Sequence, residues 1–320
     1  MYILYIGNFL SNNGPSMVDK SLLKINREIY ALQATKKKLS INDLKAIIAC
    51  DICHISAVSV LGLLVGFLCK ICGKKVTFTM HGTLLLEKKF RIVPSRRIFL
   101  EAMLIRLANK IFTVSSVLSQ QVKNLYKNID HKIVAIPNGV SIKTKNFNNI
   151  IKKPNTIVCI GGGRKEKRVL DVCKAVYHLN LLNYNIHINV FGEDSSDTDS
   201  IKNYDFVSYH GFVCHDKVLN SLSEAYLFIQ YSEYEPFSLS VFDAINFNCN
   251  VITSGSVGAI NYLSDTDLEK VCIVNSFQEL IIGIQKQLSN ELRTYSSYEH
   301  LSWEKTYSLY EENWKLINHE

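Results

Sequence analysis

Short apolar runs alternate with longer amphipathic stretches along the chain. Up to Val140 these runs are rich in residue types that favour strands, and the stretches between them have apolar residues at three- and four-residue intervals. The runs are YILYIG, AIIACDICHIS, KKVTFTM, KIFTVS and KIVAIP. This alternation predicts a parallel sheet covered by helices.

The same pattern starts again after an Asn- and Lys-rich segment at residues 141–155. The later runs are TIVCIGGG, NIHINVFG, DFVSYHGF, AYLFIQYS, CNVITS and KVCIVN. We therefore predict an α/β fold of two doubly wound, Rossmann-like domains, at residues 1–145 and 150–301, with 141–155 as the linker. A helix predicted at 302–320 carries an aromatic stripe that would let it cross back onto the first domain.

Length and composition fit two domains. The chain has 320 residues and is 47% hydrophobic, which is enough to fill two cores. Its apolar start lacks a basic flank and a cleavage site, so we expect a first strand there and not a signal peptide. The apolar segment at 55–68 is shorter than the roughly 20 residues that span a membrane, and we expect a core helix.

Charge is unevenly distributed along the chain. Residues 1–150 contain 22 Lys and Arg against 7 Asp and Glu, a net charge of +15, and the remainder has a net charge of −8. A basic half suits nucleic acid, anionic lipid or a phosphorylated substrate. Five basic residues interleaved with apolar ones resemble a segment that lies on a membrane surface, while a solvated basic surface over a core helix stays equally open. They are Lys88, Lys89, Arg91, Arg96 and Arg97.

The nine cysteines, without a predicted secretion signal, indicate reduced thiols in the cytoplasm. Cys50, Cys53, Cys69 and Cys72 have the spacing of a four-thiolate zinc site. However, the residues between the two pairs are a continuous apolar block, and thiols three apart on a strand point to opposite faces. We expect core cysteines, with zinc as the alternative.

Two carboxylates, Glu235 and Asp243, have seven residues between them in a segment that otherwise reads as buried. Pro236 suits the first turn of a helix, which would place Asp243 about two turns in and roughly 12 Å from Glu235 along the axis. Since glycosidase pairs lie about 5 to 10 Å apart, we expect these carboxylates to hold opposite ends of one long ligand. Asp243 would need a partner in its apolar helix, namely a basic side chain, backbone donors or a ribose diol.

A second candidate site combines three glycines at 161–163 with a basic cluster at 164–168, between a predicted strand and a predicted helix. Strand ends and helix N-termini of doubly wound sheets bind phosphates. We expect Arg164 and Lys167 to bind a diphosphate together with N–H groups near Ser238. A nucleotide-diphosphate sugar would satisfy all of these groups and the two carboxylates.

These residues resemble the motifs of the retaining glycosyltransferases of family 4. The family hallmark of two Glu residues, in the context E-P-F-G-L and E-A, corresponds to the segment EPFSLSVFDA at 235–244. Landmarks such as IPNGV at 136–140, HGF at 210–212 and SWEK at 302–305 extend the resemblance over nearly the whole chain. The resemblance implies the GT-B architecture, in which two Rossmann-like domains face each other across a cleft.

The sequence departs from the family pattern at several of these positions. Asp243 replaces the second Glu, Ser238 replaces a Gly, and Arg168 replaces the Gly after the lysine. Only Gly14 remains of an N-terminal double glycine, and Asn261 stands where the family has an acid. We expect these departures to affect donor identity more than the fold.

The resemblance also implies roles for single residues. Glu235 would hold donor-sugar hydroxyls, Asp243 the ribose, and His81 would approach the donor sugar. The implied catalytic residues are Glu235, His81, Arg164 and Lys167, with Lys167 favoured over Lys165 because Ala175 then falls at the usual distance. The implied donor-binding residues are Gly14, Gly162, Gly163, Gly211, Phe237, Ser238, Leu239 and Asp243.

The implied activity is transfer of a sugar from a nucleotide-diphosphate sugar, with retention, to a glycan or lipid-linked acceptor in surface-polysaccharide, O-antigen, capsule or lipopolysaccharide synthesis. We expect no metal and no other cofactor, and read the Asp197-Thr198-Asp199 segment as a solvated loop and not as a metal site. We expect a cytoplasmic protein on the inner face of the cell membrane, whose basic domain contacts anionic lipid, and no nucleic-acid partner. The alternatives are a GT-B nucleotide-sugar epimerase or, from another class, a basic nucleic-acid-binding protein.

Overall fold

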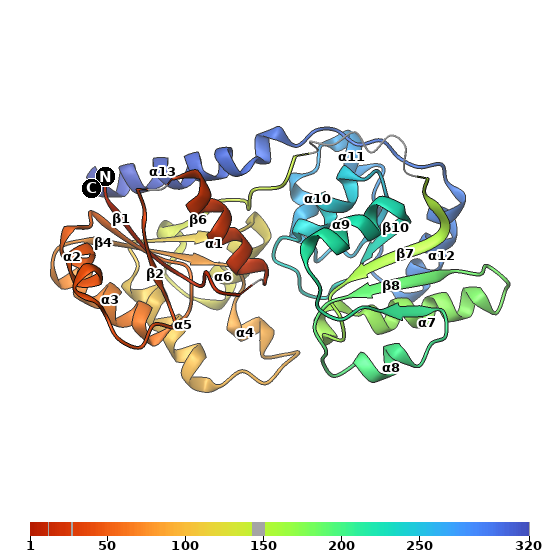
Figure 1. The fold of residues 1–320 in the computed structure, drawn as a ribbon, viewed down its shortest axis with the longest axis horizontal. Helices are drawn as coiled ribbons and strands as arrows, with labels where there is room; N and C mark the ends of the chain where they lie inside the picture. Colours follow the sequence, from red (N-terminus) through yellow and green to blue (C-terminus); the bar gives the residue numbers. More distant parts are fainter. Residues whose placement is uncertain (12, 27, 143–150, 320) are drawn as a thin grey trace. The chain divides into compact units, whose positions relative to one another are not determined.

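The structure, a computed structural model, describes residues 1–11, 13–26, 28–142 and 151–319. The chain forms two compact units, unit 1 (Met1–Gly139 and His300–Glu320) and unit 2 (Val140–Glu299). Each unit holds a six-stranded sheet covered by helices (Figure 1). The predicted α/β class with two doubly wound sheets is confirmed. Of the predicted linker at 141–155, residues 143–150 lie outside the described residues.

The sheet of unit 1 is parallel and has the order β2-β1-β3-β4-β5-β6. Because the order changes direction between β1 and β3, the loops after these strands lie at a switch point, where doubly wound sheets bind ligands. The strands are β1 (Ile3–Gly7), β2 (Tyr30–Gln33), β3 (Ile52–Ile55), β4 (Lys75–Met80), β5 (Lys110–Thr113) and β6 (Ile133–Ala135). The helices are α1 (Gly14–Ile25), α2 (Ile41–Ala49), α3 (Val60–Ile71), α4 (Leu84–Glu87), α5 (Ser95–Leu107), α6 (Ser116–Leu125), η1 (Asp130–Lys132), η4 (Glu299–Leu301) and α13 (Trp303–His319).

The C-terminal helix α13 is part of unit 1. Its Tyr307, Tyr310 and Trp314 are buried in one core with Tyr5 and Phe112 of the sheet. Aromatic side chains at these three- and four-residue steps put one face of the helix into the core. The stripe read from the sequence is therefore a packing surface that holds the end of the chain on the sheet.

Two expectations for the first half of the chain are wrong in part, and one strand was not expected. The strand predicted over AIIACDICHIS begins only at Ile52, because Ser40 and Asp43 form a capping box that starts α2 and carries the chain as a helix to Ala49. The edge strand β2 was not predicted. The core helix expected at 55–68 is α3, and only one of its faces is buried.

Of the cysteines with zinc-like spacing, Cys50 and Cys69 lie close together in the core, with their sulfur atoms 4.0 Å apart. Cys50, Cys53 and Cys69 are buried, whereas Cys72 is exposed at the end of α3, so the core interpretation is wrong for Cys72. Within the described ranges, no three His, Cys, Asp or Glu side chains are grouped so that they could hold a metal ion. Among the described helices, none combines the length and apolar character needed to cross a membrane.

The sheet of unit 2 is also parallel and has the order β12-β11-β10-β7-β8-β9. Its switch point lies between β7 and β10, so the loops that follow these two strands are neighbours. The strands are β7 (Lys153–Ile160), β8 (His187–Phe191), β9 (Val207–Tyr209), β10 (Ala225–Gln230), β11 (Asn250–Thr253) and β12 (Cys272–Ile273). The helices are η2 (Lys165–Lys167), α7 (Val169–Asn180), α8 (Thr198–Lys202), α9 (His215–Glu224), α10 (Leu239–Asn246), η3 (Gly258–Tyr262), α11 (Asp265–Leu268) and α12 (Phe277–Ser289).

Candidate functional site

The glycine loop after β7 is packed against the loop after β8. The N–H groups of Gly161 and Gly162 donate to the Phe191 carbonyl at 2.7 and 2.9 Å, and that of Gly163 donates to the Glu193 carbonyl at 3.2 Å. Gly162 has a φ of +58°, and a Cβ on it would lie 2.2 Å from the Glu193 carbonyl oxygen. These three N–H groups already donate to carbonyls, so a ligand at this loop would be bound by the side chains that follow the glycines. Donor binding by Gly162 and Gly163 stays a prediction.

The basic cluster after these glycines forms an ion pair with the second loop. The Lys167 ammonium donates to Oε2 of Glu235, and the two side chains are only 10% and 15% exposed. Arg164 is 45% exposed and lies 3.7 Å from the Glu166 carboxylate, and Lys165 is exposed. The structure therefore brings together Lys167 and Glu235, two of the four predicted catalytic residues, at the switch point of unit 2.

The Glu235 segment is extended before it becomes helical. Glu235 forms a β-bridge with Val257, and its carbonyl accepts from the Gly258 N–H at 2.9 Å. Ser238 then takes a positive φ of +82°, and α10 begins at the next residue. A left-handed residue at this point turns the chain from the bridge into the helix.

This geometry corrects the helix predicted from Pro236. Pro236 lies before α10, which starts at Leu239, so the separation of about 12 Å calculated for a continuous helix does not apply. Phe237 is buried and its ring lies 5.7 Å from Phe242 and 5.5 Å from Tyr262. Phe237 thus anchors the loop in the core, and its predicted contact with a donor could involve only its backbone.

The start of α10 is a candidate anion site. No side chain caps this helix, and the buried hydroxyl of Ser238 has no hydrogen-bond partner among the described residues. The first N–H groups of a helix lack partners within it and carry a partial positive charge. Ser238 and Leu239 lie at this start of α10, and a diphosphate contact there, as the sequence analysis predicts, would use the free N–H groups of the helix.

Asp243 lies about one turn into α10 and is largely buried. Its Oδ2 lies 3.0 Å from His215 Nε2, at the start of α9, and this hydrogen bond raises the pKa of His215. The other carboxylate oxygen, Oδ1, has no hydrogen-bond partner among the described residues. The sequence analysis gave a basic side chain and a ribose diol as alternative partners of Asp243. The carboxylate can bind both, one at each oxygen. No sequence pattern pointed to His215, since its contact with Asp243 spans 28 positions.

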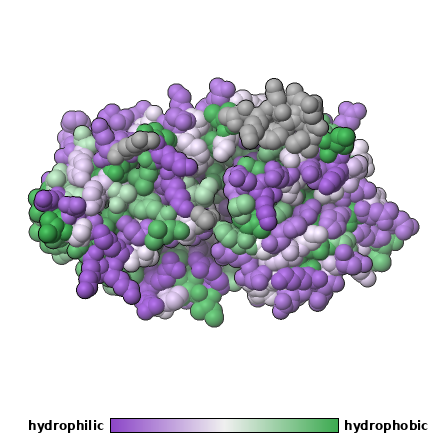
Figure 2. Space-filling model, in the orientation of Figure 1, coloured by the Kyte–Doolittle hydropathy of each residue, from purple (hydrophilic) through white to green (hydrophobic). Residues whose placement is uncertain are grey.

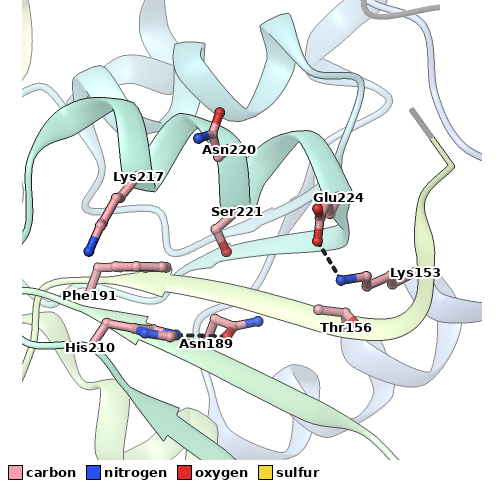
Figure 3. A pocket seen from close by; sticks show the side chains of 9 residues that line it. All are labelled: Lys153, Thr156, Asn189, Phe191, His210, Lys217, Asn220, Ser221 and Glu224. Atoms are coloured by element: carbon pink, nitrogen blue, oxygen red, sulfur yellow. Dashed lines mark hydrogen bonds and ion pairs between the residues drawn. The ribbon is translucent and has the colours of Figure 1, made fainter. Parts of the chain in front are cut away.

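The loop after β9 carries Gly211 at a φ of +67°, and its carbonyl accepts from the Gly192 N–H at 2.9 Å. A polar pocket of about 290 Å³ lies nearby, between α9 and the face of β7 and β8 (Figure 3). Its side chains pair with each other, His210 with Asn189 at 2.9 Å and Lys153 with Glu224. No predicted site residue lines it; the lining residues are Lys153, Thr156, Asn189, Phe191, His210, Lys217, Asn220, Ser221 and Glu224.

The Asp197-Thr198-Asp199 segment is the start of α8. Thr198 is buried against the glycine loop, and Asp197 donates its N–H to the Gly163 carbonyl at 3.0 Å. The solvated-loop interpretation is wrong for Thr198, because this residue is buried and packs against Gly163 of the glycine loop.

In unit 1, His81 belongs to a buried hydrogen-bond network. His81 Nε2 lies 2.8 Å from the Ser56 hydroxyl, which donates to Asp19. Asp19 also accepts from the Tyr5 hydroxyl at 2.8 Å and the Asn8 N–H at 3.1 Å. Burial raises the pKa of Asp19 to about 6 and lowers the pKa of His81 to about 4.

This network selects one tautomer of His81 at neutral pH. An ionised Asp19 accepts only, so the Ser56 proton points to it and the Ser56 oxygen accepts from His81 Nε2–H. His81 Nδ1 is then an acceptor. Gly14, at the exposed start of α1, lies at the same edge of the sheet. The roles predicted for His81 and Gly14 stay predictions, and the sequence analysis did not single out Asp19 or Ser56, which contact each other and His81 here.

Comparison with known families decides what kind of protein carries this site. The family model described as "Glycosyl transferases group 1" matches residues 140–302, more than half of the chain and all of unit 2. The chain belongs to the glycosyl transferases group 1. The model described as "Glycosyltransferase Family 4" matches residues 24–144. The protein is thus a glycosyltransferase, and its two doubly wound sheets are those of the GT-B type.

Solved structures of glycosyltransferases share this fold. HepE (Alr3699) of Anabaena, in complex with UDP and glucose, is 12% identical with a TM-score of 0.67, and 100% of this chain and 97% of that chain are covered. The lipopolysaccharide outer core galactosyltransferase WaaB is 16% identical, with a TM-score of 0.65 and 99% of both chains covered. Sucrose-phosphate synthase of Thermosynechococcus elongatus is 14% identical, with a TM-score of 0.70 and 99% of both chains covered. No curated protein matches the sequence.

The first prediction concerns Ser238 of this glycosyltransferase. A φ of +82° disfavours residues with a Cβ, and the hydroxyl is buried without a partner among the described residues. We expect Ser238→Gly to raise the free energy of unfolding by about 1 kcal/mol in urea unfolding. The control Ser240→Gly, inside α10, should lower it. Destabilisation by Ser238→Gly would contradict this account of the loop.

The second prediction concerns the charge on Asp19. Its folded pKa of about 6 lies above the ordinary 3.8, so folding favours the protonated carboxyl. The contribution of Asp19 to stability is therefore full below about pH 4 and is lost as the pH rises through about 6. We expect the free energy of unfolding, measured relative to Asp19→Asn, to fall by up to about 3 kcal/mol over this range. A difference that does not change with pH would show that burial does not raise the pKa of Asp19.

Proposed function

We propose that this glycosyltransferase moves a sugar from a nucleotide-diphosphate sugar to a glycan or lipid-linked acceptor, with retention at the anomeric carbon. The observation that carries the proposal is the meeting of three features at the switch point of unit 2. They are the Lys167–Glu235 ion pair, the uncapped start of α10, and the largely buried Asp243 with one oxygen free of described partners. The ion pair suits the donor sugar, the start of α10 suits the diphosphate, and Asp243 suits the ribose.

Each feature has a chemical reason for its part. Asp243 Oδ1 accepts from the ribose hydroxyls while His215 holds Oδ2 in place. The N–H groups at the start of α10 and the half-exposed Arg164 bind the diphosphate. Glu235 accepts from donor-sugar hydroxyls through Oε1, which has no partner among the described residues. His81 is predicted to approach the donor sugar, and its Nδ1, as an acceptor, suits a hydroxyl donor there.

The proposed reaction uses the leaving group as its base. The acceptor oxygen forms a bond to the anomeric carbon on the face from which the diphosphate leaves, and the acceptor proton passes to a departing diphosphate oxygen. Glu235 is held by Lys167, so it serves as a hydroxyl acceptor and not as the nucleophile. The charge that develops on the diphosphate is stabilised by Arg164, Lys167 and the start of α10.

Related glycosyltransferases support the donor and acceptor classes. HepE was solved with UDP-glucose, and WaaB is a lipopolysaccharide outer core galactosyltransferase. We extend this chemistry to a surface-polysaccharide, O-antigen, capsule or lipopolysaccharide acceptor, reached by a cytoplasmic protein at the inner face of the membrane. The net charge of +15 in residues 1–150 favours an anionic acceptor surface.

A donor screen tests the proposal directly. We expect one of the UDP-, GDP- or ADP-sugars to release nucleotide only when an acceptor is added.

Glu235→Gln should lower this rate of nucleotide release by about 100-fold or more, because Glu235 contacts the reacting sugar. Asp243→Asn should in addition weaken nucleotide binding in calorimetry by about tenfold or more. Asp265→Asn, an exposed carboxylate on α11, is the matched control. Donor turnover without acceptor would indicate an epimerase instead, and unchanged nucleotide affinity of Asp243→Asn would refute the ribose contact.

A further prediction concerns metals. Because Arg164, Lys167 and the start of α10 supply positive charge at the proposed diphosphate site, we expect transfer to continue in excess EDTA. The measurement compares initial rates with and without chelator. Loss of activity that Mg²⁺ or Mn²⁺ restores would contradict metal independence and reopen the Asp197-Thr198-Asp199 segment as a ligand.

A further inference from the structure

Unit 1 exposes a continuous apolar surface on two neighbouring helices, α2 and α3. The two helices are in contact with each other. Eight of their large apolar side chains are between 46% and 73% exposed. Hydrophobic side chains gather over the end of unit 1 that carries α2 and α3 (Figure 2). This α2–α3 surface consists of Ile41, Leu44, Ile48, Val60, Leu64, Phe67, Leu68 and Ile71.

The spacing of these residues shows that both helices have two apolar faces. On α3, Leu64 and Phe67 point outward, whereas Val65 and Cys69 are buried. Apolar residues scattered singly over a surface are normal, but a contiguous patch across two helices marks an interaction surface. The inner face is covered by the sheet, and within the described residues the outer face stays exposed.

The charges around this surface are of one sign. Residues 36–75 contain two carboxylates, and neither is exposed: Asp43 is buried and paired with Lys36, and Asp51 is half-buried and accepts from the Tyr2 N–H at 2.7 Å. The segment contains seven lysines, Lys36, Lys37, Lys38, Lys45, Lys70, Lys74 and Lys75. The α2–α3 surface is therefore an apolar patch with a cationic rim.

This combination of charge and apolarity favours lipid over protein. A second copy of the chain, docked face to face, would bring the lysine rims against each other. An anionic bilayer offers phosphates to the lysines and acyl chains to the apolar stripe. We propose that the α2–α3 surface lies in the interface of an anionic lipid bilayer, with both helices parallel to the membrane plane. Nine and twelve residues long, these helices are too short to cross it.

The inference deepens the proposed function and rests on it only for its purpose, which is to bring unit 1 to a membrane-bound acceptor. It places the contact on a different segment from the basic residues between 88 and 97. Those residues are exposed, but Arg91 is paired with Glu87, and few large apolar side chains accompany them. The basic stretch adds electrostatic attraction, while the α2–α3 surface supplies the apolar area that inserts.

Vesicle sedimentation without donor or acceptor tests the inference separately from transfer. We expect binding to vesicles of phosphatidylcholine mixed with phosphatidylglycerol, and little binding to phosphatidylcholine alone. Leu64→Ser with Phe67→Ser should lower the partition coefficient by about tenfold or more, because both side chains would leave the acyl region. Leu181→Ser with Leu182→Ser, at similarly exposed apolar positions of unit 2, is the matched control and should bind like the wild type.

Two further measurements make the outcome decisive. Replacing Lys37, Lys38, Lys45 and Lys70 with Gln should reduce binding to anionic vesicles, most strongly at low salt. Urea unfolding of each variant should match the wild type, since every replaced side chain is exposed. Equal binding of the α2–α3 variant and its control would overturn the proposal. So would a dimer in solution that Leu64→Ser with Phe67→Ser converts to a monomer, which would assign the surface to a protein partner.

Discussion

The ion pair between Lys167 and Glu235 joins the two loops that meet at the switch point of unit 2. Both charges are largely buried, so either one alone would be strongly destabilising. Their meeting depends on the shape of both loops. The glycine loop is held by carbonyls at the end of β8 and just after it, and the Glu235 segment by its bridge to Val257. The packing of these loops, more than helix geometry, thus determines the positions of Lys167 and Glu235 in the candidate site.

The same pair couples the ligands that the proposed function requires. While Lys167 is paired with Glu235, the lysine charge is neutralised and one carboxylate oxygen is occupied. A diphosphate beside Lys167 would provide a second anion, and Glu235 could then turn to sugar hydroxyls without leaving a buried cation alone. In the proposed reaction, binding of the donor diphosphate therefore prepares the carboxylate that positions the donor sugar.

The sequence predicted the fold well where the signal is local. The alternation of apolar and polar residue types along β4, which is buried on both faces, and the aromatic spacing of α13 are repeated patterns, and such patterns give an element its type. The sequence could not predict the boundary at Ser238, because a positive φ at a serine has no local signature. Nor could it predict contacts such as His215 with Asp243 or Asp19 with Ser56, which lie 28 and 37 positions apart and form only when the sheet assembles.

The α3 helix shows the limit of reading apolar residues as core. In water an apolar residue is expected inside, so a helix that is apolar all round is assigned to the interior. On β3, Ile52 faces the core that holds Trp314, whereas Ile55 faces Gly66 of α3, so α13 and α3 cover opposite faces of the sheet. The α13 helix carries charges of both signs, and its Lys315 forms an ion pair with Glu311 at 3.0 Å. Around α2 and α3, by contrast, the exposed charges of residues 36–75 are all lysines and lie beside exposed apolar side chains, as contact with an anionic bilayer requires.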